Sequence, residues 1–289
     1  MSLLSLSLVV LAALFHATWN LLAKRAAHAG TAFVFAYNLV ATVVYAPWVV
    51  WILLTEGMAW SGAAAGFVFL SALVHLAYSL CLQRGYQLAD LSVVYPVARG
   101  TGPMLASVGA FLLLGEDIRA SGLAGLILVV AGIALIATQG RFAAFRTPEA
   151  HRGVRWGMGT GALIAAYTVV DGWAVKMLGV VPVVLDWLSN MLRFLFLLPL
   201  VLRDRRNVMA RMRGHWGRAI AVGLLSPASY ILVLTALKMG APLHVVAPTR
   251  EMSMMAGALF GMIFLGEAVG RWRLAGSILL IAGVVLLSA

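Results

Sequence analysis

Charged residues lie inside long apolar stretches of this sequence, where an ionised side chain is expensive. Among them are Arg99, Asp171, Arg193, Arg250 and Glu251. An ionised arginine or aspartate at the centre of a membrane helix costs about 2.5–3.5 kcal/mol on insertion scales. Such groups therefore face the protein interior or a hydrated cavity, where they pair with one another or bind the charged ends of a small solute.

Aromatic and uncharged polar residues accompany these charges at helical spacing, and residues three or four apart share a helix face. A lone polar residue in a membrane helix more often bonds a neighbouring helix than a ligand. Six segments that each carry a polar stripe shift the balance toward a shared cavity. The candidate cavity residues are His16, Trp19, Asn20, His75, Tyr78, Ser79, Tyr95, Arg99, Tyr167, Asp171, Tyr230, His244, Pro248, Arg250 and Glu251.

Two uses of the buried arginines are equally supported by the sequence. Arg99 and Arg250 form structural ion pairs with Asp171 or Glu251, or they bind solute. Arg193 has no counterpart in the internal repeat described below, which favours a structural role. The sequence leaves open whether solute movement is coupled to protons, because His16, His75, Asp171 and Glu251 all carry titratable groups.

No motif for enzymatic or cofactor chemistry is present. The sequence lacks an HExxH zinc helix, a Walker A loop, and the GxSG and GxGD sequences of intramembrane proteases. The single cysteine, Cys81, allows no disulfide or thiolate metal site. We therefore expect no enzyme, no catalytic residues, no metal, no cofactor and no direct use of ATP.

The composition predicts an integral membrane protein. The chain is 63% apolar and 11% charged, against about 45–50% and about 25% in soluble domains. Stretches long enough to span a bilayer, roughly 20 residues, predict an all-α fold of ten transmembrane helices. They lie near residues 3–23, 31–54, 63–83, 90–114, 119–138, 156–177, 181–202, 218–238, 243–265 and 271–288.

An internal repeat divides these segments into two halves. Residues 115–138 align without gaps to residues 266–289, with ten of 24 positions identical at an offset of 151. Because each half has five helices, the second enters the membrane upside down, as in inverted-repeat transporters. We expect a first repeat over 1–139, a linker over 140–155 and an inverted second repeat over 156–289.

Lysine and arginine gather on one side of this predicted bundle. The gaps after the odd-numbered spans hold 15 of them, and the opposite side holds three. The positive-inside rule then places both termini outside the cytoplasm of a multi-pass protein of the cell inner membrane. The net charge of +11 is explained by topology, and no basic face indicates nucleic acid.

Prolines occupy equivalent places in spans four and nine, which points to a transport site. Pro96, Pro103 and Pro248 each remove a backbone donor. Paired interruptions in the two halves are a sequence sign of a substrate site in transporters, and static kinks are an equally good reading for each proline alone.

The pattern resembles the drug/metabolite transporter superfamily, EamA type. The resemblance rests on Leu114-Gly115-Glu116 with Gly125 and Gly132, on Leu265-Gly266-Glu267 with Gly276 and Gly283, and on Trp19-Asn20 with Lys24. It implies metabolite export by alternating access, and is strongest to YddG-type exporters of aromatic amino acids and methyl viologen. Many family members have cytoplasmic termini, whereas we keep the orientation given by the charge count.

The leading functional hypothesis is a secondary transporter that exports amino acids, aromatic or neutral, or related metabolites. Efflux of lipophilic cations is a second transport hypothesis, which three arginines against two acids in the spans disfavour. An intramembrane enzyme or a non-transporting membrane protein is the alternative of another class. The expected partners are a small-molecule substrate and the lipid bilayer, with a monomer as the default state.

Overall fold

The structure, a computed structural model, describes residues 2–58, 60–88, 91–117, 119–140, 147–256 and 270–288. Every regular element within these ranges is a helix. In chain order they are α1 (Leu3–Lys24), η1 (Ala27–Ala29), α2 (Thr31–Thr55), α3 (Gly62–Leu88), α4 (Leu91–Leu113), α5 (Ala120–Thr138), α6 (Pro148–Lys176), α7 (Pro182–Arg203), α8 (Arg205–Met212), α9 (Trp216–Lys238), α10 (Leu243–Thr249), η3 (Arg250–Met252) and α12 (Arg271–Ser288).

Seven of the described helices are long and apolar enough to cross a membrane. They are α1, α2, α3, α5, α6, α7 and α9. The helix α4 has 23 residues, but Arg99 and several glycine, serine, threonine and proline residues reduce its hydropathy. The chain is thus an all-helical, multi-pass membrane protein, and the count of ten spans stays a prediction.

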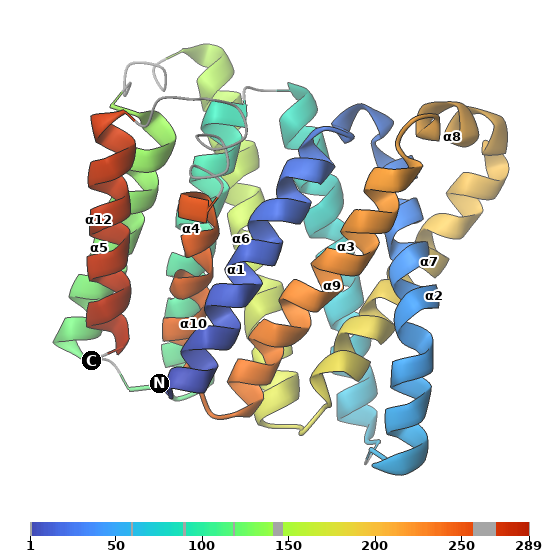
Figure 1. The fold of residues 1–289 in the computed structure, drawn as a ribbon, viewed down its shortest axis with the longest axis horizontal. Helices are drawn as coiled ribbons and strands as arrows, with labels where there is room; N and C mark the ends of the chain where they lie inside the picture. Colours follow the sequence, from blue (N-terminus) through green and yellow to red (C-terminus); the bar gives the residue numbers. More distant parts are fainter. Residues whose placement is uncertain are drawn as a thin grey trace.

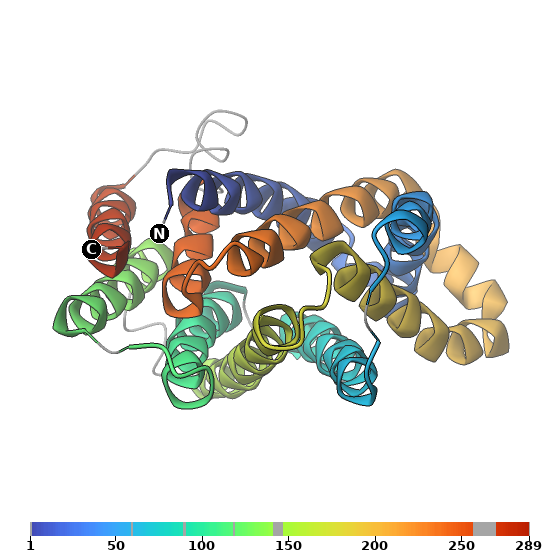
Figure 2. The ribbon, with the colours of Figure 1, turned by 90° about the horizontal axis from the view of Figure 1, so that it is seen from below.

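The helices form two facing rows when the bundle is viewed along its helices. One row holds α1 and α9, the other holds α4, α6 and α3, and α10 lies between α1 and α4 (Figure 2). The pair α5 and α12 closes one end of the rows, and α2 and α7 lie at the other. Both termini lie at the same end of the bundle, while α8 and the ends of α1 and α7 lie at the opposite end (Figure 1).

Glycines allow α5 and α12 to cross in close backbone contact. A Cβ at Gly125 would lie 2.7 Å from the carbonyl oxygen of Gly283, and a Cβ at Gly132 would lie 2.6 Å from that of Gly276. The offset of 151 converts each contact into the other. Reciprocal contacts of this kind are those that a twofold relation between two helices produces, while the inversion of the second half stays a prediction.

Close packing also joins α4 to α6. A Cβ at Gly157 would lie 2.9 Å from the carbonyl oxygen of Val94, and one at Gly161 would lie 3.0 Å from that of Ala98. The small residues of α6 thus let two helices of different halves approach closely, as small residues do in membranes.

Two helices differ from the sequence-based expectations. The helix α6 begins at Pro148, inside the expected linker, because Thr147 accepts a hydrogen bond from the Ala150 backbone N–H and proline suits the first helical position. The helix α4 continues through its prolines, whereas α10 does change after Pro248 into the tighter turn η3.

Part of the second half lies outside the described residues. The Gly266-Glu267 turn falls in the range 257–269, and part of the expected linker falls in 141–146.

Substitution of Gly132 by alanine should destabilise the bundle. The added methyl would lie 2.6 Å from a backbone oxygen, which cannot move as a flexible side chain can. We expect a loss of about 1–3 kcal/mol, the usual cost of overpacking, seen as a lower melting temperature of the purified protein in detergent. Gly122→Ala in the same helix is the matched control, because its methyl would meet nothing within 4 Å. Equal melting temperatures for the two variants would contradict the close α5–α12 contact.

Candidate functional site

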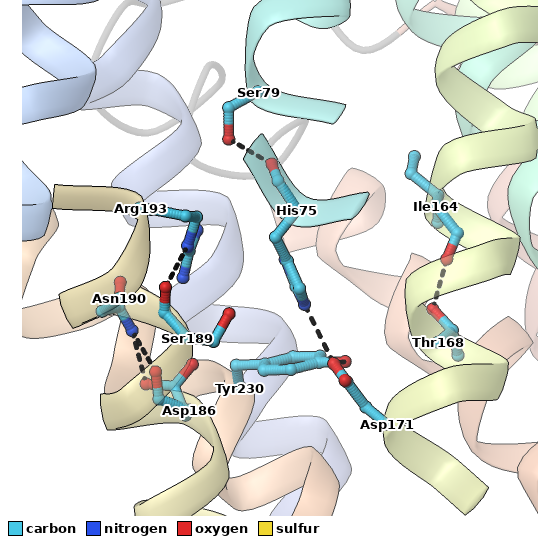
Figure 3. Close-up of polar contacts among 10 residues, drawn as sticks. All are labelled: His75, Ser79, Ile164, Thr168, Asp171, Asp186, Ser189, Asn190, Arg193 and Tyr230. Atoms are coloured by element: carbon cyan, nitrogen blue, oxygen red, sulfur yellow. Dashed lines mark hydrogen bonds and ion pairs between the residues drawn. The ribbon is translucent and has the colours of Figure 1, made fainter. Parts of the chain in front are cut away.

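A buried hydrogen-bonded cluster joins three helices between the two rows. The carboxylate of Asp171 on α6 lies 2.9 Å from Nε2 of His75 on α3 and accepts a 2.6 Å hydrogen bond from the hydroxyl of Tyr230 on α9. The His75 ring stacks on Tyr167, with ring centroids 3.9 Å apart. Asp171 is fully buried, so this pair of partners offsets the cost of placing its carboxylate inside the bundle (Figure 3).

A second buried cluster lies where α4 meets η3. Nε of Arg99 is 2.9 Å from the carboxylate of Glu251, and Nη2 of Arg99 donates to Oγ of Ser253 at 2.8 Å. The guanidinium also lies 5.5 Å from the ring centre of Tyr95. Arg99 therefore pairs with Glu251, one of the two acids expected as its partner, and solute binding by Arg99 stays a prediction.

Arg250 is buried beside this pair but is only weakly engaged. Its side chain is 2% exposed, and its Nε lies 3.9 Å from Glu251, whose carboxylate already pairs with Arg99. Its Nε and Nη2 have no hydrogen-bond partner. Electrostatic interactions connect Arg250 to Tyr167 and Tyr230 of the first cluster. The two clusters are therefore neighbours, and Arg250 presents free donors to the region they share.

The helix α1 contributes an aromatic pair to the same region. The rings of His16 and Trp19 meet edge to face with centroids 4.7 Å apart. Nε2 of His16 and Nε1 of Trp19 are buried without a hydrogen-bond partner. Asn20 instead donates to the carbonyl of His16 at 3.0 Å, which commits its amide nitrogen to its own helix.

The helix α7 carries a polar group of which only Arg193 was a candidate from the sequence. The carboxylate of Asp186 accepts a 2.9 Å hydrogen bond from the side-chain amide of Asn190, and Nε of Arg193 donates to the carbonyl of Ser189 at 3.1 Å. All four residues are less than a tenth exposed. Figure 3 shows them facing His75, Tyr230 and Asp171. Asp186 lies within the expected span 181–202, and this position was the signal available in the sequence.

The remaining candidate residues divide between the clusters and other places. Tyr78 packs edge to face on Tyr167, with centroids 5.3 Å apart, whereas Ser79 donates to the carbonyl of His75 on its own helix. Pro248 is buried in α10 one turn before the Arg99–Glu251 pair. His244 does not join these contacts but binds Glu116 at the end of the bundle where the termini lie.

Glu116 connects the two halves at that end. Its carboxylate binds Nζ of Lys176 at 2.6 Å and Nδ1 of His244 at 2.6 Å. It also accepts the backbone N–H groups of Leu243 and His244 at 2.7 and 3.0 Å, at the start of α10. Burial alone would raise the pKa of Glu116, but the hydrogen bonds from His244, Lys176 and Leu243 outweigh burial and hold the pKa at about 2.

Glu116→Gln should therefore destabilise the protein in a pH-dependent manner. The carboxylate has a lower pKa in the folded protein than its ordinary 4.5, so its stabilisation is complete above that value and is lost as the pH falls through about 2. We expect the variant to lose about 1–3 kcal/mol at neutral pH. Its deficit in melting temperature should be smaller at about pH 3 than at about pH 7.

Glu56→Gln, at an exposed acid after α2, is the matched control and should change little. A deficit for Glu116→Gln that is the same at both pH values would show that the ionised carboxylate does not hold the two halves together.

A groove elsewhere on the bundle has a different character. It encloses about 440 Å³ between α4 and α5. Its lining is apolar and consists of Met104, Leu123, Leu126, Ile127, Val130, Ala131 and Ala134. Such a lining suits hydrocarbon and not a polar solute, so the candidate functional site is the buried polar region between the rows.

Comparison with known proteins identifies the family. The sequence matches the EamA-like transporter family over residues 3–138 and 151–289. This chain belongs to the EamA-like transporter family. The match covers both halves of the chain, and it also places the EamA protein in the drug/metabolite transporter superfamily.

Two curated relatives match part of this EamA protein. Multidrug resistance protein EbrB of Bacillus subtilis (strain 168) is 38% identical over 85 residues, which are 29% of this chain and 68% of EbrB. EbrB of Bacillus atrophaeus is 40% identical over 87 residues, with the same shares. A protein of known crystal structure shares the fold, with a TM-score of 0.74, 14% identity, and coverage of 98% of this chain and 95% of that one.

The EamA membership makes this chain a membrane transporter with a small-molecule substrate. It also agrees with the expectation that the chain is not an enzyme, since members of this family are transporters.

Proposed function

We propose that this EamA-family protein is a secondary transporter of the inner membrane that exports amino acids or similar small zwitterions. In this proposal the polar region between the rows is the solute site, and two inverted five-helix halves expose it alternately to each side. The site residues are those of the two clusters, of the His16–Trp19 pair and of the polar group on α7, with Arg250 and Asp171 as the two ends of the solute site. YddG-type exporters are the functional analogue.

The observation that carries the proposal is the division of the buried charges into two groups. Among the described residues less than a tenth exposed there are three arginines and three acids. Arg99, Arg250 and Glu251 form a group with one surplus positive charge, when all are ionised. Asp171, Asp186 and Arg193 form a group with one surplus negative charge. A solute with a carboxylate at one end and an ammonium at the other would neutralise both surpluses.

Free polar atoms are available in both groups to bind such a solute. Nε and Nη2 of Arg250 have no hydrogen-bond partner, and neither has Oδ1 of Asp171. A guanidinium binds a carboxylate through two parallel hydrogen bonds, whereas a carboxylate oxygen accepts from an ammonium. Because an unpaired buried polar atom is costly, a solute that satisfies these atoms gains binding energy that a neutral apolar solute does not.

Aromatic rings connect the two groups and supply an apolar wall. Tyr230 donates to Asp171 and interacts electrostatically with Arg250. Tyr167 packs against His75, Tyr78 and Tyr230. Rings with polar edges accommodate an amino-acid side chain of variable size, which supports aromatic and neutral amino acids as substrates.

Efflux of lipophilic cations is the second candidate function. The partial likeness to EbrB favours it, and so does the acidic group beside the rings of Tyr230 and Tyr167, because cations bind carboxylates and aromatic faces. When Asp186 is counted, the buried acids of the described chain equal the buried arginines in number. The excess of arginine that disfavoured cation efflux is therefore gone. Arg250 separates the two hypotheses, since a cation has no use for its free donors.

Counterflow of labelled L-phenylalanine into proteoliposomes loaded with the unlabelled amino acid tests the proposal. We expect Arg250→Ala to reduce uptake about tenfold to a hundredfold, from the loss of charge-assisted hydrogen bonds worth about 1.5–3 kcal/mol. Arg250→Lys should retain part of the uptake, because it keeps the charge but loses the planar fork. Arg211→Ala, at an exposed residue of α8, is the matched control.

The same vesicles assayed with ethidium distinguish the alternative. Cation efflux predicts that Arg250→Ala transports ethidium at least as well as the wild type, whereas Asp171→Asn does not. An absence of amino-acid counterflow in the wild type, together with ethidium transport, would replace the proposal by the second candidate.

A further inference from the structure

Asp186 differs from the other buried acids of the described chain in its partners. Glu251 pairs with Arg99, and Asp171 is held by His75 and Tyr230. The carboxylate of Asp186 is 5% exposed and is bonded by the neutral amide of Asn190, with no ion pair to any described side chain. A buried carboxylate without a cationic partner is costly when ionised and is usually neutralised by a proton.

The surroundings of Asp186 contain a second unpaired group. Oγ of Ser189, 2% exposed and one turn along α7, has no hydrogen-bond partner, and in Figure 3 Ser189 points from α7 toward His75 and Tyr230. Across the same space Oδ1 of Asp171 is also unpartnered. Buried polar oxygens without a partner are sites where a protein binds water, an ion or a ligand.

Charged and titratable groups face Asp186 from each helix packed around it. Like charge comes from Asp171, and the positive charge comes from Arg193, two turns along the same helix. The groups are Tyr45 on α2, His75 on α3, Asp171 on α6, Arg193 on α7 and Tyr230 on α9. Arg193 alone cannot neutralise the carboxylates of both Asp171 and Asp186. These three residues together therefore favour one bound proton until another cation enters.

We propose that Asp186 is a proton-binding site whose occupancy alternates with that of the solute. The inference rests on the proposed function and adds its coupling ion. When the ammonium of the solute reaches Asp171, its positive charge favours ionised Asp186, and the proton leaves. When the solute departs, Asp186 takes up one proton and becomes a neutral carboxylic acid. No electron moves and no covalent bond other than O–H changes, so each solute exported is exchanged for one proton entering.

Proteoliposomes with a pH-sensitive dye in the lumen test this directly. Addition of L-phenylalanine should move protons across the membrane in the wild type, and a pH gradient should stimulate uptake of the labelled amino acid several-fold. Asp186→Asn, a permanently uncharged copy of the protonated acid, should abolish both effects, and the counterflow that remains should no longer depend on the pH, because the variant has no proton to exchange at this position.

Asp204→Asn is the matched control, because Asp204 is an exposed acid at the end of the same helix. It should leave proton movement unchanged. Should Asp186→Asn fail to reconstitute, Asp186→Glu keeps a titratable carboxyl in a changed position and should shift the pH of half-maximal transport; an unchanged pH profile would overturn the inference.

Two further outcomes separate this inference from the proposed function. Wild-type counterflow without proton movement, or full coupling in Asp186→Asn, would overturn the role of Asp186 and leave amino-acid export standing. Absence of counterflow in the wild type would remove the proposed function itself.

Discussion

The cost of an ionised side chain inside a bilayer determines how this protein is organised. Arg99 and Glu251 come from different halves of the chain, and neither is stable between the rows without the other. Their ion pair fixes α4 against η3, and Ser253 extends the contact. Asp171 repeats the arrangement, because its partners His75 and Tyr230 also come from different halves. The polar region is therefore built at the boundary between the halves and depends on both.

The cost of buried charge also explains why further contacts hold the two halves together beside the polar region. Glu116 joins the halves again at the end where the termini lie, through Lys176, His244 and the first backbone N–H groups of α10. Glycine contacts hold α5 to α12 outside the polar region. In an inverted-repeat transporter the solute site lies between such connections, and the halves change their relative position around it. Arg250 and Asp171 lie between these connections with unpaired polar atoms.

Much of the fold was predictable, because its signals are local in the sequence. Apolar stretches gave most of the long helices within a few residues, except where Thr147 and Pro148 extend α6 beyond its apolar stretch. The short helix α8 was not expected, and the later part of the expected span 243–265 lies outside the described residues. Gly125, Gly132, Gly276 and Gly283 occupy matching positions in the two halves of the sequence, and the structure adds that they meet across α5 and α12. The continuity of α4 was not predictable from its prolines, because neighbouring groups can compensate for one lost backbone donor.

The sequence indicated candidate residues for the site, but it did not indicate which of them contact one another. The polar stripes found His75, Tyr167, Asp171 and Tyr230, yet the sequence could not show that Asp171 binds a histidine and a tyrosine instead of an arginine. His244 shared the stripe pattern and lies with Glu116, since spacing along one helix does not fix depth in the bundle. Pairing across helices depends on three-dimensional position, which a single sequence does not contain.

The central claim is that the buried charges form a site complementary to a zwitterion. Equilibrium binding of labelled L-phenylalanine to the purified protein, in competition with phenethylamine and 3-phenylpropionate, tests it most directly. Each competitor keeps the ring and only one of the two charged ends. The account predicts that phenylalanine binds at least about tenfold more tightly than either, because each charged end adds about 1.5 kcal/mol or more. Phenethylamine binding as tightly as phenylalanine would contradict the account and would show that the carboxylate end has no partner in the site.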